Sequence, residues 1–143
     1  MRRFVFRLQR ILDIREQICD EARQELVRRN QARDQEARVL AELEGEYLRA
    51  MIRDGGTYSA SELVMFGDYR ASLKQRIAQQ KERLIAAQKA VDEAKERYVE
   101  ASRDVKALEK LREKRQLEHT ELALREEGAA LDEFAIQRTP RGN

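Results

Sequence analysis

Apolar residues recur at alternating steps of three and four along the second half of the chain. One series of larger residues falls at every seventh position (Ile77, Leu84, Val91, Tyr98 and Val105), and a series of mostly small residues is interleaved with it (Gln80, Ala87, Ala94, Ala101 and Leu108). This repeat is typical of the a/d seam of a left-handed coiled coil. The pattern predicts a long helix over about residues 60–136, which a partner helix could approach closely along the alanines.

The first half of the chain carries a patchier apolar stripe, which predicts a helix over about residues 3–53. Its members are Phe4, Leu8, Ile11, Ile14, Ile18, Ala22 and Leu26, followed by Ala37, Leu40, Leu43, Tyr47 and Met51. Residues 28–38 between them offer only alanine as apolar content. Their Arg, Gln, Ala and Glu residues are good helix formers, so we expect a continuous helix with its weakest packing in the middle.

The stretch RDGGTYSASE, residues 53–62, interrupts the helical pattern and predicts a turn over about residues 54–59. Ser59 with Glu62 three residues later is a capping box, which can satisfy the first free amides of the second helix. Tyr58 and Leu63 are placed as a hydrophobic staple on either side of that cap. The turn therefore carries a specific start signal for the second helix.

A stop signal comes directly before it, because Gly55 and Gly56 can adopt the left-handed conformation that ends a helix. Connections this short usually join antiparallel neighbours. If the two helices fold back on each other about Gly56, residues whose numbers sum to about 113 lie opposite one another, as Leu40 and Leu73 would. The predicted fold class is all-α, an antiparallel coiled-coil hairpin with a longer second helix. It forms one domain over residues 1–138, with a disordered tail over residues 139–143.

The second predicted helix continues beyond Leu108, although the first helix has no residues left there to pair with it. Its apolar positions there would be exposed on a lone helix, and they are Leu117, Leu122, Leu124, Leu131 and Phe134. An unpaired apolar stripe usually marks a docking surface for another chain. Self-association of these segments is the alternative.

Composition agrees with long helices, since 39% of the 143 residues are charged, 6% are aromatic, and only one is proline. Disorder would not preserve the regular apolar spacing. The 29 basic and 27 acidic residues leave a net charge of only +2, which argues against nucleic acid as the main partner. No apolar run approaches the roughly 18 residues of a membrane span, so we expect no direct membrane insertion and a cytoplasmic location.

Candidates for chemistry are few. A single Cys and a single His exclude an internal disulfide framework and a zinc-type ligand set. His119 has Glu118 beside it and no Ser, Cys or second His in helical reach, which favours a satisfied or solvated histidine over a catalytic one. Cys19 adjoins the apolar Ile18, which favours a half-buried thiol. We predict no catalytic, cofactor-binding or metal-binding residues and no enzyme activity.

Several segments together resemble the FliJ family of flagellar type III export proteins. They are the basic N-terminus running into FRLQRILDIRE, the long hairpin, the stretch EKLREKRQLEH and the late LDEFA. Injectisome relatives share the same hairpin. The resemblance covers nearly the whole chain and implies a non-enzymatic coiled-coil stalk. The joined terminal ends of such a stalk sit in the ring of a hexameric export ATPase and promote its assembly and activity.

The resemblance also implies further partners and a location. They are the cytoplasmic domain of the export-gate membrane protein and the substrate export chaperones, with the chain peripherally associated with the flagellar basal body at the inner membrane. Carried over by position, the export-gate contact would involve Glu36, Leu40, Leu43, Tyr47, Tyr69, Leu73, Arg76 and Gln80. Arg76 and Gln80 stand where the family pattern has a small residue and a histidine. The contact with the ATPase ring would involve Phe4, Arg7, Leu8, Ile11, Leu117, Leu124, Leu131 and Phe134.

Residue spacing offers alternative roles for some of these positions. Leu40, Leu43, Tyr47 and Leu73 lie on or near the seam, where packing is the alternative, whereas Tyr69 falls beside it and could face outward. The basic cluster of Arg2, Arg3, Arg7 and Arg10 fits electrostatic docking onto acidic loops of the ring, or simple solubility, or an anionic surface.

Two other functions stay open on the sequence. A prefoldin-like chaperone or tethering adaptor would use apolar residues at the open ends, which Phe4, Phe6 and Phe134 supply. An RNA-gripping coiled-coil arm would need a continuous basic stripe. Lys81 and Arg83 belong to such a stripe, but Glu82 and Asp92 interrupt it.

Overall fold

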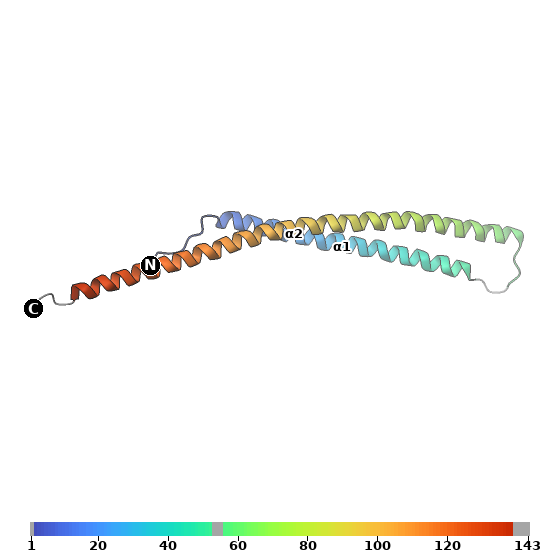
Figure 1. The fold of residues 1–143 in the computed structure, drawn as a ribbon. Helices are drawn as coiled ribbons and strands as arrows, with labels where there is room; N and C mark the ends of the chain where they lie inside the picture. The colour runs from blue at the N-terminus through green and yellow to red at the C-terminus, as the bar shows by residue number, and fades with distance from the viewer. Residues whose placement is uncertain (1, 53–55, 139–143) are drawn as a thin grey trace, which may run out of the picture. The chain divides into compact units, whose positions relative to one another are not determined.

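The computed structural model describes residues 2–52 and 56–138 and forms two α-helices within them (Figure 1). Helix α1 spans Gln9–Met51, with 43 residues, and helix α2 spans Ala60–Arg138, with 79 residues. The predicted all-α class and the longer second helix are confirmed. The predicted disordered tail over residues 139–143 lies outside the described residues.

Helix α1 starts at Gln9, later than the predicted start near residue 3. A turn precedes it, in which the backbone N–H of Gln9 donates to the carbonyl of Phe6 at 3.1 Å. Phe6 is buried in this non-helical segment, so the segment before the helix contributes to the core although it departs from the helical pattern.

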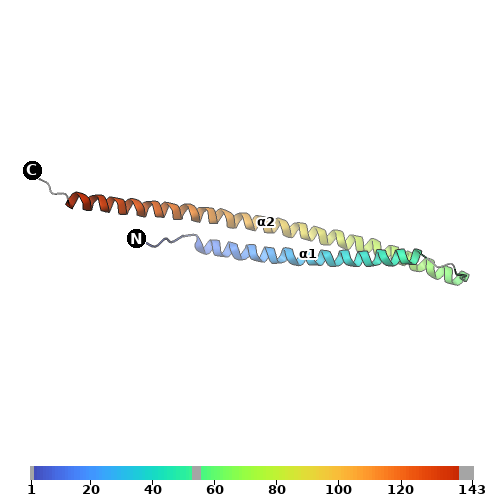
Figure 2. The ribbon, with the colours of Figure 1, turned by 90° about the horizontal axis from the view of Figure 1, so that it is seen from below.

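The chain divides into two compact units. Unit 1 combines the chain up to Cys19 with the chain from Glu100 onward, and unit 2 comprises Asp20–Val99. Within each unit, a stretch of α1 lies beside a stretch of α2 that runs in the opposite direction (Figures 1 and 2). In unit 2 the antiparallel direction follows from the contacts of Arg33 with Gln88 and of Tyr47 with Lys74.

The predicted seam of α2 is confirmed. All ten of its residues are buried or half-buried, from Ile77 to Leu108. Leu73, which lies seven residues before Gln80, has no exposed surface and is the most deeply buried large side chain among the described residues. The seven-residue spacing therefore identified the packed face of this helix correctly.

The predicted stripe of α1 is partly wrong. Ile11, Ile14 and Ile18 are 46%, 50% and 43% exposed, whereas Leu12 is buried and Cys19 is half-buried. The packed face of α1 recurs every seven residues through Leu12, Cys19, Leu26, Arg33, Leu40 and Tyr47. Ile11 and Ile18 each precede one of these positions by one residue, which turns them onto the flank of the helix.

The middle of α1 places polar side chains in its packed face. Arg33 Nη1 donates to Gln88 Oε1 at 3.3 Å. Gln80 is 4% exposed, and its Nε2 donates to the backbone carbonyl of Glu36 at 3.0 Å and to the Glu36 carboxylate. The expected shortage of apolar packing here is confirmed, and hydrogen bonds across the helix pair partly replace it.

The register of the two helices differs from the prediction. Contacting residues have numbers that sum to 116 for Glu36 with Gln80, and to 121 for Arg33 with Gln88 and for Tyr47 with Lys74, rather than about 113. The two contacts with a sum of 121 lie eight residues, about one heptad, from the predicted register, and the contact of Glu36 with Gln80 lies three residues from it. Because a slip of seven residues opposes the same heptad positions again, the apolar pattern could not distinguish the two registers.

The start of α2 is capped as predicted. The hydroxyl of Ser59 accepts from the backbone N–H of Glu62 at 3.1 Å. The predicted staple differs, since the ring of Tyr58 packs edge-on against Phe66 with centroids 5.3 Å apart, while Leu63 is half exposed. Gly56 does not adopt the left-handed conformation expected of it, and Gly55 lies outside the described residues.

Candidate partner-binding surfaces

Three of the residues expected at the export gate belong to the core of unit 2. Leu43, Leu73 and Gln80 are all buried between the two helices. A partner could touch them only after the helices separate. Their positions on the packed face therefore give them a structural role in holding the helix pair together.

Two other members of the expected gate set are exposed on α2. Tyr69 is 49% exposed, as its place beside the seam predicted, and Arg76 is also exposed. They are seven residues apart, so they lie on one face of the helix at a separation of about 10 Å along its axis. A phenol and a guanidinium on one face can together anchor a partner, because both combine a flat apolar surface with hydrogen-bond donors.

The remaining gate residues are half-buried at the edge of the helix pair. Glu36 accepts the hydrogen bonds from Gln80, and Leu40 lies one turn further along α1. The ammonium of Lys74 lies 5.9 Å from the ring centroid of Tyr47. The structure thus splits the eight expected gate residues into a buried group, a half-buried group and the exposed pair Tyr69 and Arg76.

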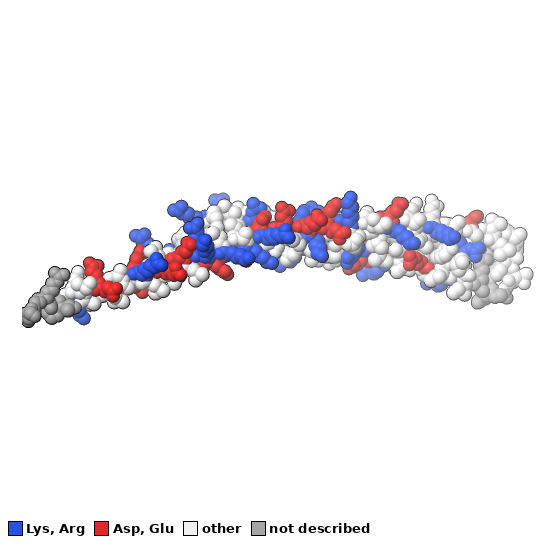
Figure 3. Space-filling model, in the orientation of Figure 1, with Lys and Arg blue, Asp and Glu red and all other residues white. Residues whose placement is uncertain are grey.

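A cluster of exposed apolar side chains lies where α1 ends and α2 begins. Its exposed side chains are Leu48, Met51, Ile52, Leu63, Val64 and Met65. Figure 3 shows few charges on this part of unit 2, at the right of the view, whereas basic and acidic side chains are interleaved elsewhere on that face. The sequence analysis missed this patch, because the exposure of these residues depends on the register and on the start of α2 beyond the end of α1 (Figure 1).

In unit 1, the N-terminal segment packs against α2 through His119. A nitrogen of the half-buried His119 ring, Nε2, lies 2.8 Å from the backbone carbonyl of Arg2 and must donate the proton, since the carbonyl only accepts. The ring of Phe4 lies against the same imidazole, with centroids 5.6 Å apart. The sequence predicted that His119 is either hydrogen-bonded or solvated. It could not identify the backbone carbonyl of Arg2 as the hydrogen-bond partner, because Arg2 lies in a non-helical segment.

A groove of about 900 Å³ runs between the N-terminal segment and α2. Four arginines line it, Arg2, Arg3, Arg7 and Arg115, and Glu118 is the one acidic residue in its lining. The same lining includes three residues of the expected ring-binding set, Phe4, Arg7 and Leu8. The structure therefore brings three of the four N-terminal members of that set together on one surface, whereas Ile11 does not line the groove.

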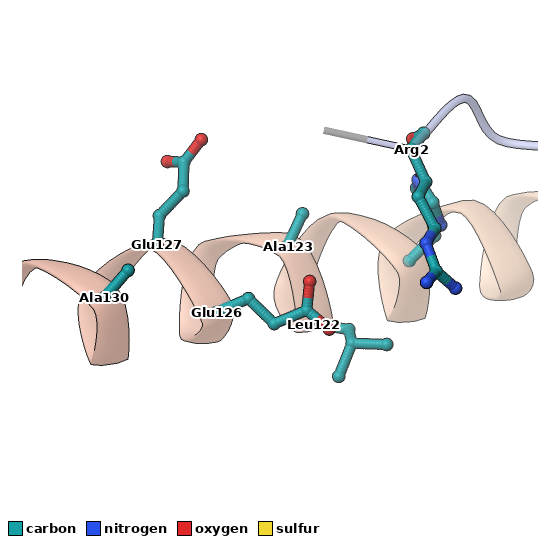
Figure 4. A pocket seen from close by; sticks show the side chains of 7 residues that line it. Arg2, Leu122, Ala123, Glu126, Glu127 and Ala130 are labelled. Atoms are coloured by element: carbon teal, nitrogen blue, oxygen red, sulfur yellow. The ribbon is translucent and has the colours of Figure 1, made fainter.

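A smaller hollow of about 360 Å³ adjoins the groove on α2 (Figure 4). Arg2 reaches over the helix from the N-terminal segment, and Leu122 and Glu126 lie along the helix surface, whereas Glu127 projects outward. The carboxylates at this end contrast with the arginines of the larger groove. Charge thus changes sign along this side of α2.

The C-terminal part of the expected ring-binding set is exposed on α2. It consists of Leu117, Leu124, Leu131 and Phe134, and Leu131 is 68% exposed. The three leucines follow one another at seven-residue intervals, so they share one face. Leu117 is two residues from His119, which places it about 160° around the helix from the groove. The structure therefore separates this stripe from the N-terminal residues of the same set.

Part of the surface charge on α1 is paired within the helix. Glu25 accepts hydrogen bonds from Arg28 at 2.7 Å and from Arg29 at 2.8 Å. The hydrogen bond from Arg28, with the positive charges of Arg28 and Arg29, lowers the pKa of the Glu25 carboxyl below its ordinary value of 4.5. Solvent screens exposed pairs of this kind, so they contribute little to the stability of the helix.

Residues 2–52 and 56–138 contain no group of three or more His, Cys, Asp and Glu side chains arranged to hold a metal ion. Neither α1 nor α2, as far as the structure describes them, combines the length and the apolarity that a membrane crossing requires.

Comparison with known protein families gives one result. The family model described as "Flagellar FliJ protein" matches residues 4–143. Comparisons with curated proteins and with solved structures found no significant match. The matched range takes in both helices and the exposed leucines of α2, and it begins after Arg2 and Arg3 of the groove.

Proposed function

Since the chain belongs to the FliJ family of flagellar proteins, we propose that it acts as the stalk of the flagellar export ATPase. Membership makes it a non-enzymatic component of the flagellar export apparatus. In this proposal its terminal end, formed by the start of the chain and the C-terminal part of α2, enters the hexameric ATPase ring and promotes the assembly and activity of that ring.

The observation that carries the proposal is the exposed leucine stripe of α2. Leu117, Leu124 and Leu131 face solvent along about 21 Å of helix, as expected from a rise of 1.5 Å per residue. Exposed leucines that recur on one face of a charged helix are unfavourable in water, and their burial becomes favourable when another protein covers them. A surrounding ring would cover such a stripe without requiring a pocket in the stalk.

The second part of the proposal concerns the helix pair in unit 2. The cytoplasmic domain of the export-gate membrane protein docks beside the packed seam, where Tyr69 and Arg76 are accessible. Substrate export chaperones are further partners of the chain. The protein then works in the cytoplasm, peripherally associated with the flagellar basal body at the inner membrane, and links the ATPase to the gate.

Hydrolysis measurements test the stalk proposal. The ATP hydrolysis rate of the cognate export ATPase is titrated with the full chain, with the double variant Leu124→Glu/Leu131→Glu, and with the control Ile85→Glu. Ile85 is also highly exposed but lies in unit 2. We expect activation that saturates near one chain per hexamer for the full chain and the control, and little activation by the double variant. Absence of activation by the full chain would contradict the proposal.

A further inference from the structure

The groove between the N-terminal segment and α2 concentrates positive charge on a chain that is otherwise nearly balanced. Four arginines and one glutamate line it, for a net charge of +3, whereas the whole chain carries +2. The first twelve residues hold four arginines and no acidic residue. This charge is therefore local, and it attracts negatively charged groups to one surface.

The rest of the lining is apolar apart from His119. Phe4, Leu8 and Leu111 are half-buried in the groove, and Phe6 is buried. The contacts of His119 with Arg2 and with Phe4 hold the N-terminal segment against α2. The groove is thus formed before a ligand arrives, which lowers the entropic cost of binding.

We propose that this groove binds an acidic amphipathic segment of a partner protein. Carboxylates of the segment pair with Arg3, Arg7 and Arg115, whose planar guanidinium groups match carboxylate geometry. An aliphatic or aromatic side chain beside those carboxylates packs over Phe4 and Leu111. The arginine side chains are exposed, so they can approach a ligand without refolding.

The apolar lining favours a protein segment over a phosphate polymer. Double-stranded nucleic acid of arbitrary sequence is held by basic residues that track its backbone, and its stacked bases offer no apolar side chain to Leu8 or Leu111. A basic track of that kind would continue along the molecule, whereas the face seen in Figure 3 mixes both signs of charge. A segment with acidic residues on one side and apolar residues on the other matches both parts of the lining.

This inference rests on the proposed function, because it specifies what the ATPase ring presents to the terminal end of the stalk. It goes beyond that function by assigning separate roles to the two exposed surfaces of unit 1. The arginines of the groove bind negatively charged groups of the partner. The leucine stripe, on the other side of α2, contributes apolar contact alone.

A peptide experiment tests the groove by itself. The probe is a fluorescein-labelled amphipathic helical peptide of Glu, Leu and Phe, and its control replaces every Glu by Lys. Binding to the full chain is followed by fluorescence anisotropy at low and physiological salt. The test variant replaces Arg2, Arg3, Arg7 and Arg115 by Gln, and the matched control replaces Arg23, Arg38, Arg83 and Arg97, which are exposed in unit 2. Circular dichroism verifies that both remain helical.

We expect the acidic peptide to bind the unchanged chain and the matched control, and to bind the groove variant at least about tenfold more weakly at low salt. Replacing the four groove arginines by Lys should restore part of the affinity, because charge returns without the planar guanidinium. The basic peptide should not bind. Equal binding to groove variant and matched control would overturn the inference. Tighter binding of single-stranded RNA through the same arginines would also overturn it.

A second measurement separates this inference from the proposed function. Affinity for the purified hexameric export ATPase is measured for the unchanged chain and for the same two variants. If the unchanged chain binds the ATPase and the groove variant binds equally well, the inference fails and the stalk proposal stands. If the unchanged chain does not bind the ATPase, the stalk proposal fails, whatever the peptide result.

Discussion

Replacing the buried glutamine of the seam tests how the helix pair in unit 2 is held together. Gln80 occupies a core position of α2 with 4% of its surface exposed, and both hydrogen bonds of its amide nitrogen reach Glu36 across the pair. Two substitutions separate its packing from its hydrogen bonding. Gln80→Ala removes both, whereas Gln80→Leu removes the hydrogen bonds and keeps the volume.

The expected free energies differ clearly between the two variants. In Gln80→Ala the lost hydrogen bonds and the cavity together lower the free energy of unfolding by about 2–4 kcal/mol. In Gln80→Leu the burial of an apolar side chain offsets the lost hydrogen bonds, so the change stays within about 1 kcal/mol. Glu36 is only half-buried, and its carboxylate can exchange the amide for water.

Urea unfolding of the full chain, followed by circular dichroism at a helical wavelength, measures these differences. A loss well under 1 kcal/mol in Gln80→Ala would show that the residue is not packed as the structure has it. An equally large loss in both variants would refute the reasoning that packing compensates for the hydrogen bonds.

The variant Gln80→Leu also tests the register of α1 against α2. A polar group at a seam position selects one alignment of two helices at some cost in stability. Cys19→Ser first removes the native thiol. A short bismaleimide should then join Glu44→Cys to Lys74→Cys but not to Gly67→Cys. The reason is that the observed register puts Gly67 about 13 Å too far along the helix axis. We expect Gln80→Leu to allow both cross-links through a one-heptad slip. Cross-linking only to Gly67→Cys in the unchanged seam would contradict the observed register.

Three further predictions concern the ends and surfaces of the helices. Ser59→Ala removes the cap of α2 and should lower the free energy of unfolding by about 1 kcal/mol in the same urea assay. The lowered pKa of Glu25 stabilises the folded chain above the ordinary pKa of 4.5, and this stabilisation is lost as the pH falls through the lowered value. Glu25→Gln should therefore lower the Tm at pH 7 but not in strong acid, where the carboxyl is protonated; an equal difference at both pH values would argue against the Arg28 contact. Tyr69→Ala should weaken binding to the cytoplasmic export-gate domain about tenfold in a titration, whereas Ile85→Ala should not.

The regular part of the sequence predicted the fold well for a physical reason. A seven-residue apolar repeat can be satisfied only by a helix that buries one face against another helix. The ten seam positions of α2 and the cap at Ser59 were therefore readable from the sequence. The same reasoning failed for Ile11, Ile14 and Ile18, because hydrophobicity alone does not distinguish the packed face from its flank.

The candidate sites were less predictable, because they depend on contacts between distant residues. The heptad positions of Leu73 and Gln80 implied that both are buried. The resemblance to the FliJ family, carried over position by position, instead assigned them to the contact with the export gate. The groove in unit 1 depends on a turn before α1 and on the contact of Arg2 with His119. No periodic pattern encodes a contact of that kind, so the sequence indicated the basic cluster without its apolar lining.

Site-specific photo-cross-linking to the export ATPase tests the central claim most directly. A photoreactive p-benzoylphenylalanine is introduced in place of Leu124 or Leu131, and in place of Ile85 as the control, in the full chain expressed in flagellated cells. The stalk proposal predicts cross-links from the two leucine positions to the ATPase subunit and none from the control. No ATPase adduct at either leucine position, or equal adducts at all three positions, would contradict it.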